Sequence, residues 1–486
     1  MAETERAGAW DPTAPGQAAA RDSGAARIAR IEAALRPESP LRSEPLPPIG
    51  LAELMARYRV PGVSVAVIDG GGVAWARGYG VLETGRPAPV TPDTAFQACS
   101  ISKAVAAAVA LCLVQEGSLD LDEDVNRYLT SWKVPANGAW QPRVTLRQLL
   151  SHTAGLTGNW YRGFRRGEPV PALLDVLEGR APANTPPVRA VLIPGTRYRY
   201  SGSHYTVLQQ LLIDRTGRPF PELAEERVFA PLGMHHSSYD QAYPDSHPDS
   251  AAAGHYIGGE PVHGKWRIVP EMAGAGLWTT PTDLARLLIE VQRAHAGDPG
   301  RLWRPEIIRQ ALTEQPGGYG LGFSLSGTGP QRRFGHGGDN IGYKCTMEAY
   351  VERGLGAVVM TNGDDGYLIV EELSRAIAEE YAWPGQPQGT ASPPAAPPPL
   401  DAETWRPCAG TYELRPGLRL TVAVEDGSLR LTVPGQPPIP LTPRSESECF
   451  AQAVNVEITF TRTAGGEVAE LELRQESQTQ RAPRLS

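Results

Sequence analysis

The stretch Ala104–Val114 is apolar on every side, and this constrains the fold more than any other part of the chain. Its sequence is Ala-Val-Ala-Ala-Ala-Val-Ala-Leu-Cys-Leu-Val. A helix without a polar face has to be buried, and this run is too short to cross a membrane. We therefore predict a central helix around which a large domain packs.

A candidate nucleophile and its base stand at the head of this helix, in the pattern Ser100-x-x-Lys103. Three residues of spacing put the hydroxyl and the amine on one helical face. Unpaired N–H groups at a helix N-terminus favour an alkoxide and the oxyanion formed by its attack on a carbonyl. Burial would lower the pKa of Lys103, as a base requires. A serine N-cap followed by a lysine that reaches solvent fits the motif equally well.

Lysine is rare in this chain, which makes its use at position 103 informative. Only four of the 46 basic residues are lysine, at 103, 133, 265 and 344. Arginine stays protonated at any physiological pH, whereas lysine can lose its proton. A chain that otherwise uses arginine has kept the one basic side chain that can act as a base here.

Composition describes an ordinary globular enzyme and argues against several partners. Hydrophobic residues make up 41% of the 486 positions, charged residues 21%, and the net charge is −8, which disfavours nucleic acid and anionic membrane. The five cysteines are odd in number and have no paired spacing, which indicates free thiols in a reducing compartment. The first 24 residues lack the basic and apolar regions of a signal peptide. We expect a cytoplasmic protein without a membrane partner.

Strands near both ends of the first domain enclose a helical middle. We expect an antiparallel sheet whose first and last strands meet, with helices on its faces and a mostly helical region inserted: an α+β fold within the broad α/β class. The segments that carry this prediction are two short helices at 25–35 and 50–59, strands at 61–68, 73–79, 343–351 and 356–360, and helices at 205–214 and 367–382.

Composition changes twice after the first domain. Residues 384–400 are dense in Pro, Gly, Ala and Ser and predict a linker. Residues 401–486 carry β-rich segments at 418–424, 428–433, 456–461 and 468–473, which predict a small all-β barrel or sandwich. We divide the chain into a disordered tail (1–24), a first domain (25–383), the linker (384–400) and the β domain (401–486).

Three motifs follow one another in a single order: Ser100-Ile-Ser-Lys103, Tyr200-Ser-Gly202 and His336-Gly-Gly338. With them the chain resembles the serine β-lactamase and penicillin-binding-protein superfamily, in the branch of class C β-lactamases, D-aminopeptidases, esterases and related acyltransferases. The resemblance covers about residues 50–382 and implies a β-lactamase/transpeptidase-like fold, with a lipocalin-like module after it. Further stretches similar to that branch are Phe96–Ser100, Leu149–Leu156, Pro231–Met234 and Gly276–Thr280.

The resemblance implies a role for each motif residue. Ser100 would be the nucleophile, Lys103 its activating partner, and Tyr200 the group that passes a proton to the leaving group. His336 would take the place of the third motif's lysine and hydrogen-bond Tyr200 or the substrate. The backbone N–H groups of Ser100 and Asp339 would form the oxyanion hole.

Glycine at the remaining motif positions bears on substrate access. Gly338 would let substrate backbone approach closely. Gly202 would also border the substrate, but it stands where penicillin-recognising members have asparagine, so this position offers no side-chain amide. That departure favours ester or acyl-transfer chemistry over β-lactam recognition. Three aromatic residues in the loop Asn159–Phe164 fit either a pocket rim or surface packing.

We predict a serine hydrolase that needs neither cofactor nor metal and cleaves an ester or amide of a small molecule or short peptide. His235-His236 and the other dispersed histidines lack metal-ligand spacing. Two alternatives stay open: an acyltransferase or peptide cyclase that uses the same acyl-enzyme, and a non-catalytic binding protein on this scaffold. Oligomeric state is left open.

Overall fold

The computed structural model describes residues 24–37, 47–158, 161–298, 300, 302–385 and 405–485, the last range without 416, 426–427, 433, 435–438, 444, 452–455, 464 and 476–477. These residues form two compact units, one ending at residue 385 and one beginning at residue 405. The tail predicted for residues 1–24 falls, apart from Gly24, outside the described residues, and so does most of the predicted linker.

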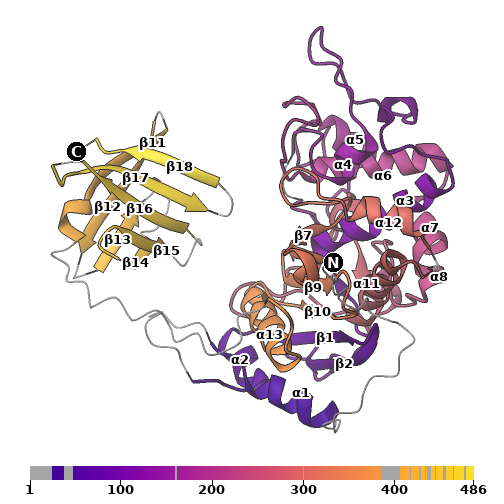
Figure 1. Ribbon diagram of the computed structural model, residues 1–486, viewed down its shortest axis with the longest axis horizontal. Coiled ribbons are helices and arrows are strands. Elements are labelled where there is room, and N and C mark those ends of the chain that lie inside the picture. The colour runs from indigo at the N-terminus through magenta and orange to yellow at the C-terminus, as the bar shows by residue number, and fades with distance from the viewer. Residues whose placement is uncertain are drawn as a thin grey trace, which may run out of the picture. The chain divides into compact units, whose positions relative to one another are not determined.

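The first unit is built on an antiparallel sheet (Figure 1). Among the described residues its strands run in the order β2 (Gly72–Gly80), β1 (Gly62–Asp69), β10 (Gly356–Thr361), β9 (Tyr343–Tyr350), β8 (Arg333–Asn340) and β7 (Ser324–Ser326). Val63 of β1 lies opposite Thr361 of β10, and Ile68 opposite Gly356. The first and last strands therefore meet, as predicted, and the helical region is an insertion between β2 and β7.

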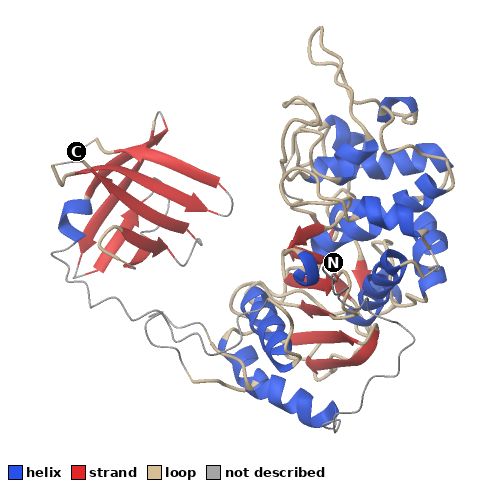
Figure 2. Ribbon diagram, in the orientation of Figure 1, coloured by secondary structure: helices blue, strands red, loops and turns tan. Residues whose placement is uncertain are grey.

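Helices cover both faces of this sheet because β1 is apolar on both sides (Figure 2). Val65 and its alternate neighbours pack with α1 (Gly24–Ala33), α2 (Leu51–Arg57) and α13 (Gly366–Glu380). Ala66 and Ile68 face the larger core, which contains α11 (Pro281–Ala296). Helix α11 begins with Pro281 at its first position, and Thr280 Oγ1 accepts from the N–H of Asp283 at 3.1 Å.

The apolar run forms α3 (Ser102–Gln115), whose residues 102–113 are all buried. This confirms the predicted central helix. The remaining helices are η2 (Val125–Arg127), α4 (Leu146–Leu150), α5 (Leu173–Glu178), α6 (Gly202–Thr216), α7 (Phe220–Ala224), η3 (Glu225–Phe229), α8 (Ala230–Leu232), α9 (Tyr243–Ser246), α10 (Met272–Ala275), α12 (Pro305–Ala311) and η4 (Gly329–Gln331). Short strands pair β3 (Phe96–Gln97) with β6 (Trp278–Thr279) and β4 (Phe164–Arg165) with β5 (Arg267–Ile268).

The second unit begins with the turn η5 (Arg406–Cys408), which leads into an antiparallel sheet in which each strand pairs with the next. Its strands are β11 (Gly410–Arg415), β12 (Leu418–Glu425), β13 (Ser428–Thr432), β14 (Ile439–Pro443), β15 (Glu448–Ala451), β16 (Val456–Arg462), β17 (Val468–Gln475) and β18 (Gln478–Pro483). A bridge between Tyr412 and Arg484 brings the two edges together, so the sheet nearly closes into the predicted barrel. Strands β11, β14, β15 and β18 were not predicted.

Candidate active site

Ser100 and Lys103 meet at the start of the central helix. Ser100 lies in the turn η1 (Cys99–Ile101), and Lys103 lies in the first turn of α3 with 1% of its surface exposed. The Lys103 Nζ atom is 2.9 Å from Ser100 Oγ and 2.7 Å from the carbonyl oxygen of Gly274. Burial lowers the pKa of Lys103 to about 7.

These two contacts determine which atoms the N–H groups and the lone pair of a neutral Lys103 face. A backbone carbonyl only accepts hydrogen bonds, so the contact with Gly274 takes one N–H of the amine. The lone pair of the neutral amine is then left for the hydroxyl of Ser100. Lys103 is therefore oriented to accept the proton of Ser100.

The turn that carries Ser100 is held in an uncommon backbone conformation. Cys99, directly before Ser100, has a φ of 54°, in the left-handed region that β-carbon sterics disfavour. The hydroxyl of Ser102 stabilises the turn, because it donates to the carbonyl of Cys99 at 2.5 Å and accepts from the N–H of Leu277 at 3.0 Å. One hydrogen bond within the turn and one from the segment next to β6 thus stabilise this conformation.

Tyr200 lies just before α6 and completes a three-residue group. Its side chain forms a hydrogen bond with that of Ser100, and its ring centre is 5.1 Å from Lys103 Nζ. Burial raises the pKa of Tyr200, and the hydrogen bond to Ser100 lowers it less. Tyr200 is therefore a neutral phenol at physiological pH, able to donate a proton.

His336 on β8 lies near this group, with a ring centre 6.3 Å from that of Tyr200. Burial, and then the charge of Lys103, lower the pKa of His336 to about 3, so the imidazole is neutral. Its Nδ1 atom is 2.5 Å from the carbonyl oxygen of Gly337, which only accepts. The proton is therefore on Nδ1. Nε2 is a buried acceptor with no hydrogen-bond partner among the described residues.

Gly338 and Asp339 continue β8 past the turn that carries Ser100. A β-carbon at position 338 would lie 2.7 Å from the carbonyl oxygen of Ala98 and 2.8 Å from Cβ of Cys99. Glycine is thus required for β8 to approach the turn that carries Ser100. The carboxylate of Asp339 points elsewhere, to an ion pair of 2.9 Å with Lys344, which leaves the backbone as the part of Asp339 that can serve the site.

Tyr161 fills the space that a side chain at position 202 would need. A β-carbon at Gly202 would lie 2.5 Å from Cζ of Tyr161, and the Tyr161 hydroxyl donates to the carbonyl of Gly202. The same ring covers Gly274 and lies with its centre 5.5 Å from Lys103 Nζ. Tyr161 therefore borders the group around Lys103, although Asn159 and Trp160 of the same loop lie outside the described residues.

The structure thus brings together the residues of all three predicted motifs and adds three that sequence reasoning did not assign to the site. Tyr161 belonged to a loop noted for its aromatic residues. His152, which packs on Tyr200, belonged to a stretch noted only for family likeness. The carbonyl of Gly274 has no signal in the sequence, because every residue has such a group.

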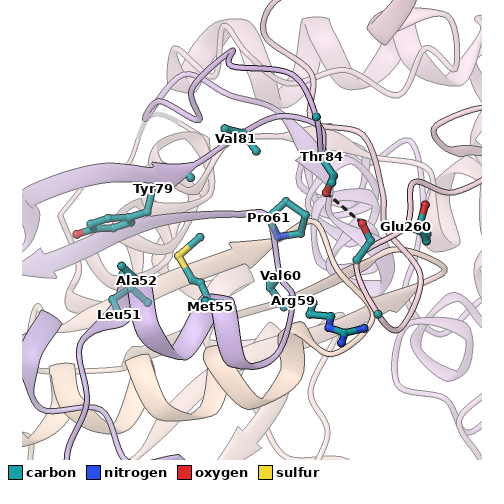
Figure 3. A pocket seen from close by; sticks show the side chains of 15 residues that line it. Leu51, Ala52, Met55, Arg59, Val60, Pro61, Tyr79, Val81, Thr84 and Glu260 are labelled. Carbon is teal, nitrogen blue, oxygen red and sulfur yellow. Dashed lines mark hydrogen bonds between the residues drawn. The ribbon is translucent and has the colours of Figure 1, made fainter.

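An apolar groove of about 630 Å³ lies elsewhere on the first unit. Figure 3 shows Met55 and its neighbours on α2 below the groove, Tyr79 of β2 at one end and Thr84 at the other. The hydroxyl of Thr84 donates to the carbonyl of Gly259 at 3.0 Å, so a hydrogen bond connects the two segments that line this end of the groove. The groove shares no lining residue with the three motifs.

The described residues contain neither a membrane-spanning helix nor a cluster of metal-ligating side chains. None of their helices combines the length and the apolar character needed to span a bilayer. Nor do three His, Cys, Asp or Glu side chains gather anywhere among them in a group that could hold a metal ion.

Comparison with known proteins relates both units to families. Residues 51–382 match the Beta-lactamase family, and residues 393–484 match a domain of unknown function (DUF3471). Penicillin-binding protein 4 of Amycolatopsis lactamdurans is 28% identical over 75% of this chain and 96% of its own length. The D-aminopeptidase of Brucella ovis is 27% identical over 63% of this chain, which spans 57% of that enzyme.

Solved structures show the same fold. The octameric penicillin-binding protein homologue from Pyrococcus abyssi is similar with a TM-score of 0.60 at 23% identity, over 89% of this chain and 98% of the other. SurE gives a TM-score of 0.57 at 23% identity, over 89% of this chain and 97% of its own. With the family match spanning most of its length, the chain belongs to the Beta-lactamase family and is a serine hydrolase.

Proposed function

We propose that this hydrolase cleaves an ester or amide of a small molecule or short peptide through an acyl-enzyme on Ser100. The observation that carries the proposal is the 2.9 Å contact between Ser100 Oγ and the buried amine of Lys103. Near pH 7 about half of Lys103 is neutral, since burial lowers its pKa to about 7. A base with a pKa close to the working pH is the most effective kind.

In the first half of the reaction, Ser100 Oγ attacks the substrate carbonyl as its proton moves to the Lys103 lone pair. The carbonyl oxygen becomes an oxyanion, which the N–H groups of Ser100 and Asp339 would stabilise. When the bond to the leaving group breaks, the Tyr200 phenol gives that group a proton and regains one from Lys103. The products of this half are the acyl-enzyme and the protonated leaving group.

In the second half, water attacks the acyl carbon and loses a proton to the same Lys103–Tyr200 pair. The bond to Ser100 Oγ breaks, the serine oxygen takes the proton back, and a carboxylic acid leaves. Every group returns to its initial state, so neither a redox partner nor a further co-reactant is consumed.

Two features of the site support esters and small amides rather than β-lactams. Tyr161 occupies the space in which a side-chain amide at position 202 would hold the acylamino group of a substrate. His336 offers a neutral acceptor where a lysine would offer a cation for a substrate carboxylate. The D-aminopeptidase relatives support keeping D-aminoacyl amides among the candidate substrates.

The test is the intact mass of wild type and of Ser100→Ala after brief exposure to four donors: a p-nitrophenyl ester, a cephalosporin, a D-aminoacyl amide and a peptidyl thioester. We expect an acyl adduct or turnover with the ester or the D-aminoacyl amide in wild type alone. Equal behaviour of the two proteins with every donor would contradict the mechanism. Chromatography of the products with and without an added amine measures hydrolysis against acyl transfer.

A further inference from the structure

His152 forms hydrogen bonds with the backbone on both sides of Tyr200. Its carbonyl accepts from the N–H of Arg199 at 2.8 Å, and its ring Nδ1 accepts from the N–H of Ser201 at 3.3 Å. The imidazole also packs on the Tyr200 ring, with centres 4.2 Å apart and planes tilted by 38°. One fully buried residue thus holds the segment 199–201 by its backbone, its ring nitrogen and its ring face.

A second buried histidine, His204 in the first turn of α6, fixes the tautomer and orientation of this ring. His204 Nε2 accepts from the N–H of Leu156 at 3.3 Å, so in the neutral ring the proton lies on Nδ1. That proton points to His152 Nδ1, 3.0 Å away. His152 Nδ1 is therefore an acceptor, as the contact with Ser201 also requires. Burial keeps the pKa of both histidines low, so this arrangement persists at neutral pH.

The backbone at position 152 has an uncommon conformation. His152 has a φ of 58°, in the left-handed region that non-glycine residues rarely adopt, although histidine, asparagine and aspartate do so more often than other residues. The left-handed turn follows α4 directly and is what brings the ring across to the segment before α6.

We propose that His152 is a positioning residue that holds the phenol of Tyr200 against Ser100, so that Tyr200 can deliver a proton to the leaving group. This inference rests on the proposed acyl-enzyme mechanism and adds to it a residue outside the reacting atoms. Misplacing a catalytic group by about 1 Å can cost about 100-fold in rate. That cost should fall on substrates whose leaving group needs the proton.

His255 offers a matched control in the same unit. It is as completely buried as His152, its Nδ1 lies 2.8 Å from the carbonyl of Asn362, and its Nε2 accepts from the N–H of Thr84 at 3.1 Å. Both histidines therefore connect backbone segments through ring nitrogens, but the partners of His255 belong to other parts of the fold. Its replacement measures what the loss of a buried structural histidine does by itself.

The experiment compares kcat/KM for a series of esters of one acid, from p-nitrophenol to a simple alcohol. For His152→Gln we expect a loss of about 30–100-fold with the alkyl ester and less than about fivefold with the nitrophenyl ester, which departs without a proton. His152→Asn keeps an acceptor at the Nδ1 position and suits the left-handed φ, so it should recover most of the loss. His255→Gln should lower the melting temperature without changing the ratio between the two esters.

A double-mutant cycle with Tyr200→Phe decides whether His152 acts through Tyr200. We expect His152→Asn and His152→Gln to cost no more than about twofold once the phenol is absent. An undiminished loss in the Tyr200→Phe background, or an equal loss with every leaving group, would overturn the proposal. If His152→Gln does not fold, His152→Leu, which keeps most of the bulk of the ring but has no acceptor, takes its place in the cycle. If wild type showed no turnover that depends on Ser100, the proposed function itself would be contradicted. The comparison with Ser100→Ala detects that outcome separately.

Discussion

Two lysines of the first unit, the buried Lys103 and the partly buried Lys344, have opposite surroundings and opposite pKa shifts. Lys344 on β9 forms ion pairs of 2.9 Å with both Asp339 and Asp364. Burial alone would lower the pKa of Lys344, but these two carboxylates outweigh it and raise the pKa. Lys103 faces a hydroxyl and a backbone carbonyl instead, and burial lowers its pKa to about 7.

The difference shows that burial does not by itself decide what a lysine can do. A buried amine with carboxylate partners stays charged and acts as a structural cation. A buried amine with neutral partners can release its proton near neutral pH and act as a base. The four predictions below test this contrast, beginning with the one that should have the largest effect.

Lys103→Arg should nearly abolish activity, because the guanidinium stays protonated and cannot accept the proton of Ser100. We expect kcat/KM to fall by about 10³–10⁴-fold, the scale of a lost general base. Lys344→Arg keeps the charge that its two carboxylates require and should retain activity within about threefold. Steady-state kinetics on one ester measures both variants. A Lys103→Arg enzyme within tenfold of wild type would show that Lys103 is not the base.

Tyr161→Glu should convert the surroundings of Lys103 toward those of Lys344. The ring centre of Tyr161 is 5.5 Å from Lys103 Nζ, and an opposite charge at about that distance raises the pKa of an amine by about 1–2 units. The neutral fraction of Lys103 at pH 7, and with it the activity, should fall by about 5–50-fold and recover at higher pH.

The matched variant for this change is Tyr161→Gln, which has nearly the same shape without the charge. Both variants lose the hydroxyl that donates to the Gly202 carbonyl, so their absolute rates can differ from wild type for that reason. Only the position of the ascending limb in kcat/KM against pH reports the electrostatic effect. If both limbs lie at the same pH, the carboxylate does not act on Lys103.

The wild-type pH profile should rise through neutrality, because the proposed mechanism uses the neutral amine of Lys103 as the base. With the pKa of Lys103 at about 7, the neutral fraction and kcat/KM should fall by about tenfold from pH 8 to pH 6. Burial raises the pKa of Tyr200 and lowers that of His336 to about 3, which places both outside this window.

One buried carboxyl group also titrates near neutral pH and must be separated from Lys103. Burial raises the pKa of Glu271 to about 7, and Glu271 lines a small cavity together with Tyr161. Glu271→Gln removes this titration. The ascending limb should remain where it is in that variant, and its disappearance would assign the limb to Glu271.

The sequence could predict those contacts of the site that are made by side chains at a fixed spacing along one helix or strand. Ser100 and Lys103 lie three residues apart, and helical geometry alone places them together. The buried α3 followed in the same way from a run without a polar face. The pairing of β1 with β10 followed from strands at both ends of the domain.

Contacts that depend on the path of the backbone could not be predicted. Gly274 serves Lys103 with a carbonyl that every residue has, and His152 reaches Tyr200 only because its φ of 58° turns the chain. Tyr161 fills the space beside Gly202 through a loop whose course its composition does not determine. In the second unit, β14 (Ile-Pro-Leu-Thr-Pro) was missed because two prolines interrupt the strand pattern.

The smallest effect on activity is expected from Lys344→Met, which tests the structural side of the contrast. Asp364 keeps a hydrogen bond from the N–H of Gly342 at 2.7 Å, and the carboxylate of Asp339 is largely exposed, so neither is left isolated. We expect the free energy of unfolding in urea to fall by about 1–3 kcal/mol and kcat to stay within about threefold. Lys265→Met breaks a more exposed pair with Glu83 and should cost about 1 kcal/mol or less.

Lys344→Met can also show that this division between a structural and a catalytic lysine is wrong. Lys344 is held by Asp339, whose backbone N–H is the proposed second donor to the oxyanion. If that ion pair positions the donor, Lys344→Met would lower kcat by far more than threefold, and the loss would be similar for good and poor leaving groups because both pass through the same oxyanion. A large, leaving-group-independent loss would make the charged lysine as necessary to the chemistry as the neutral one, although it never touches the substrate.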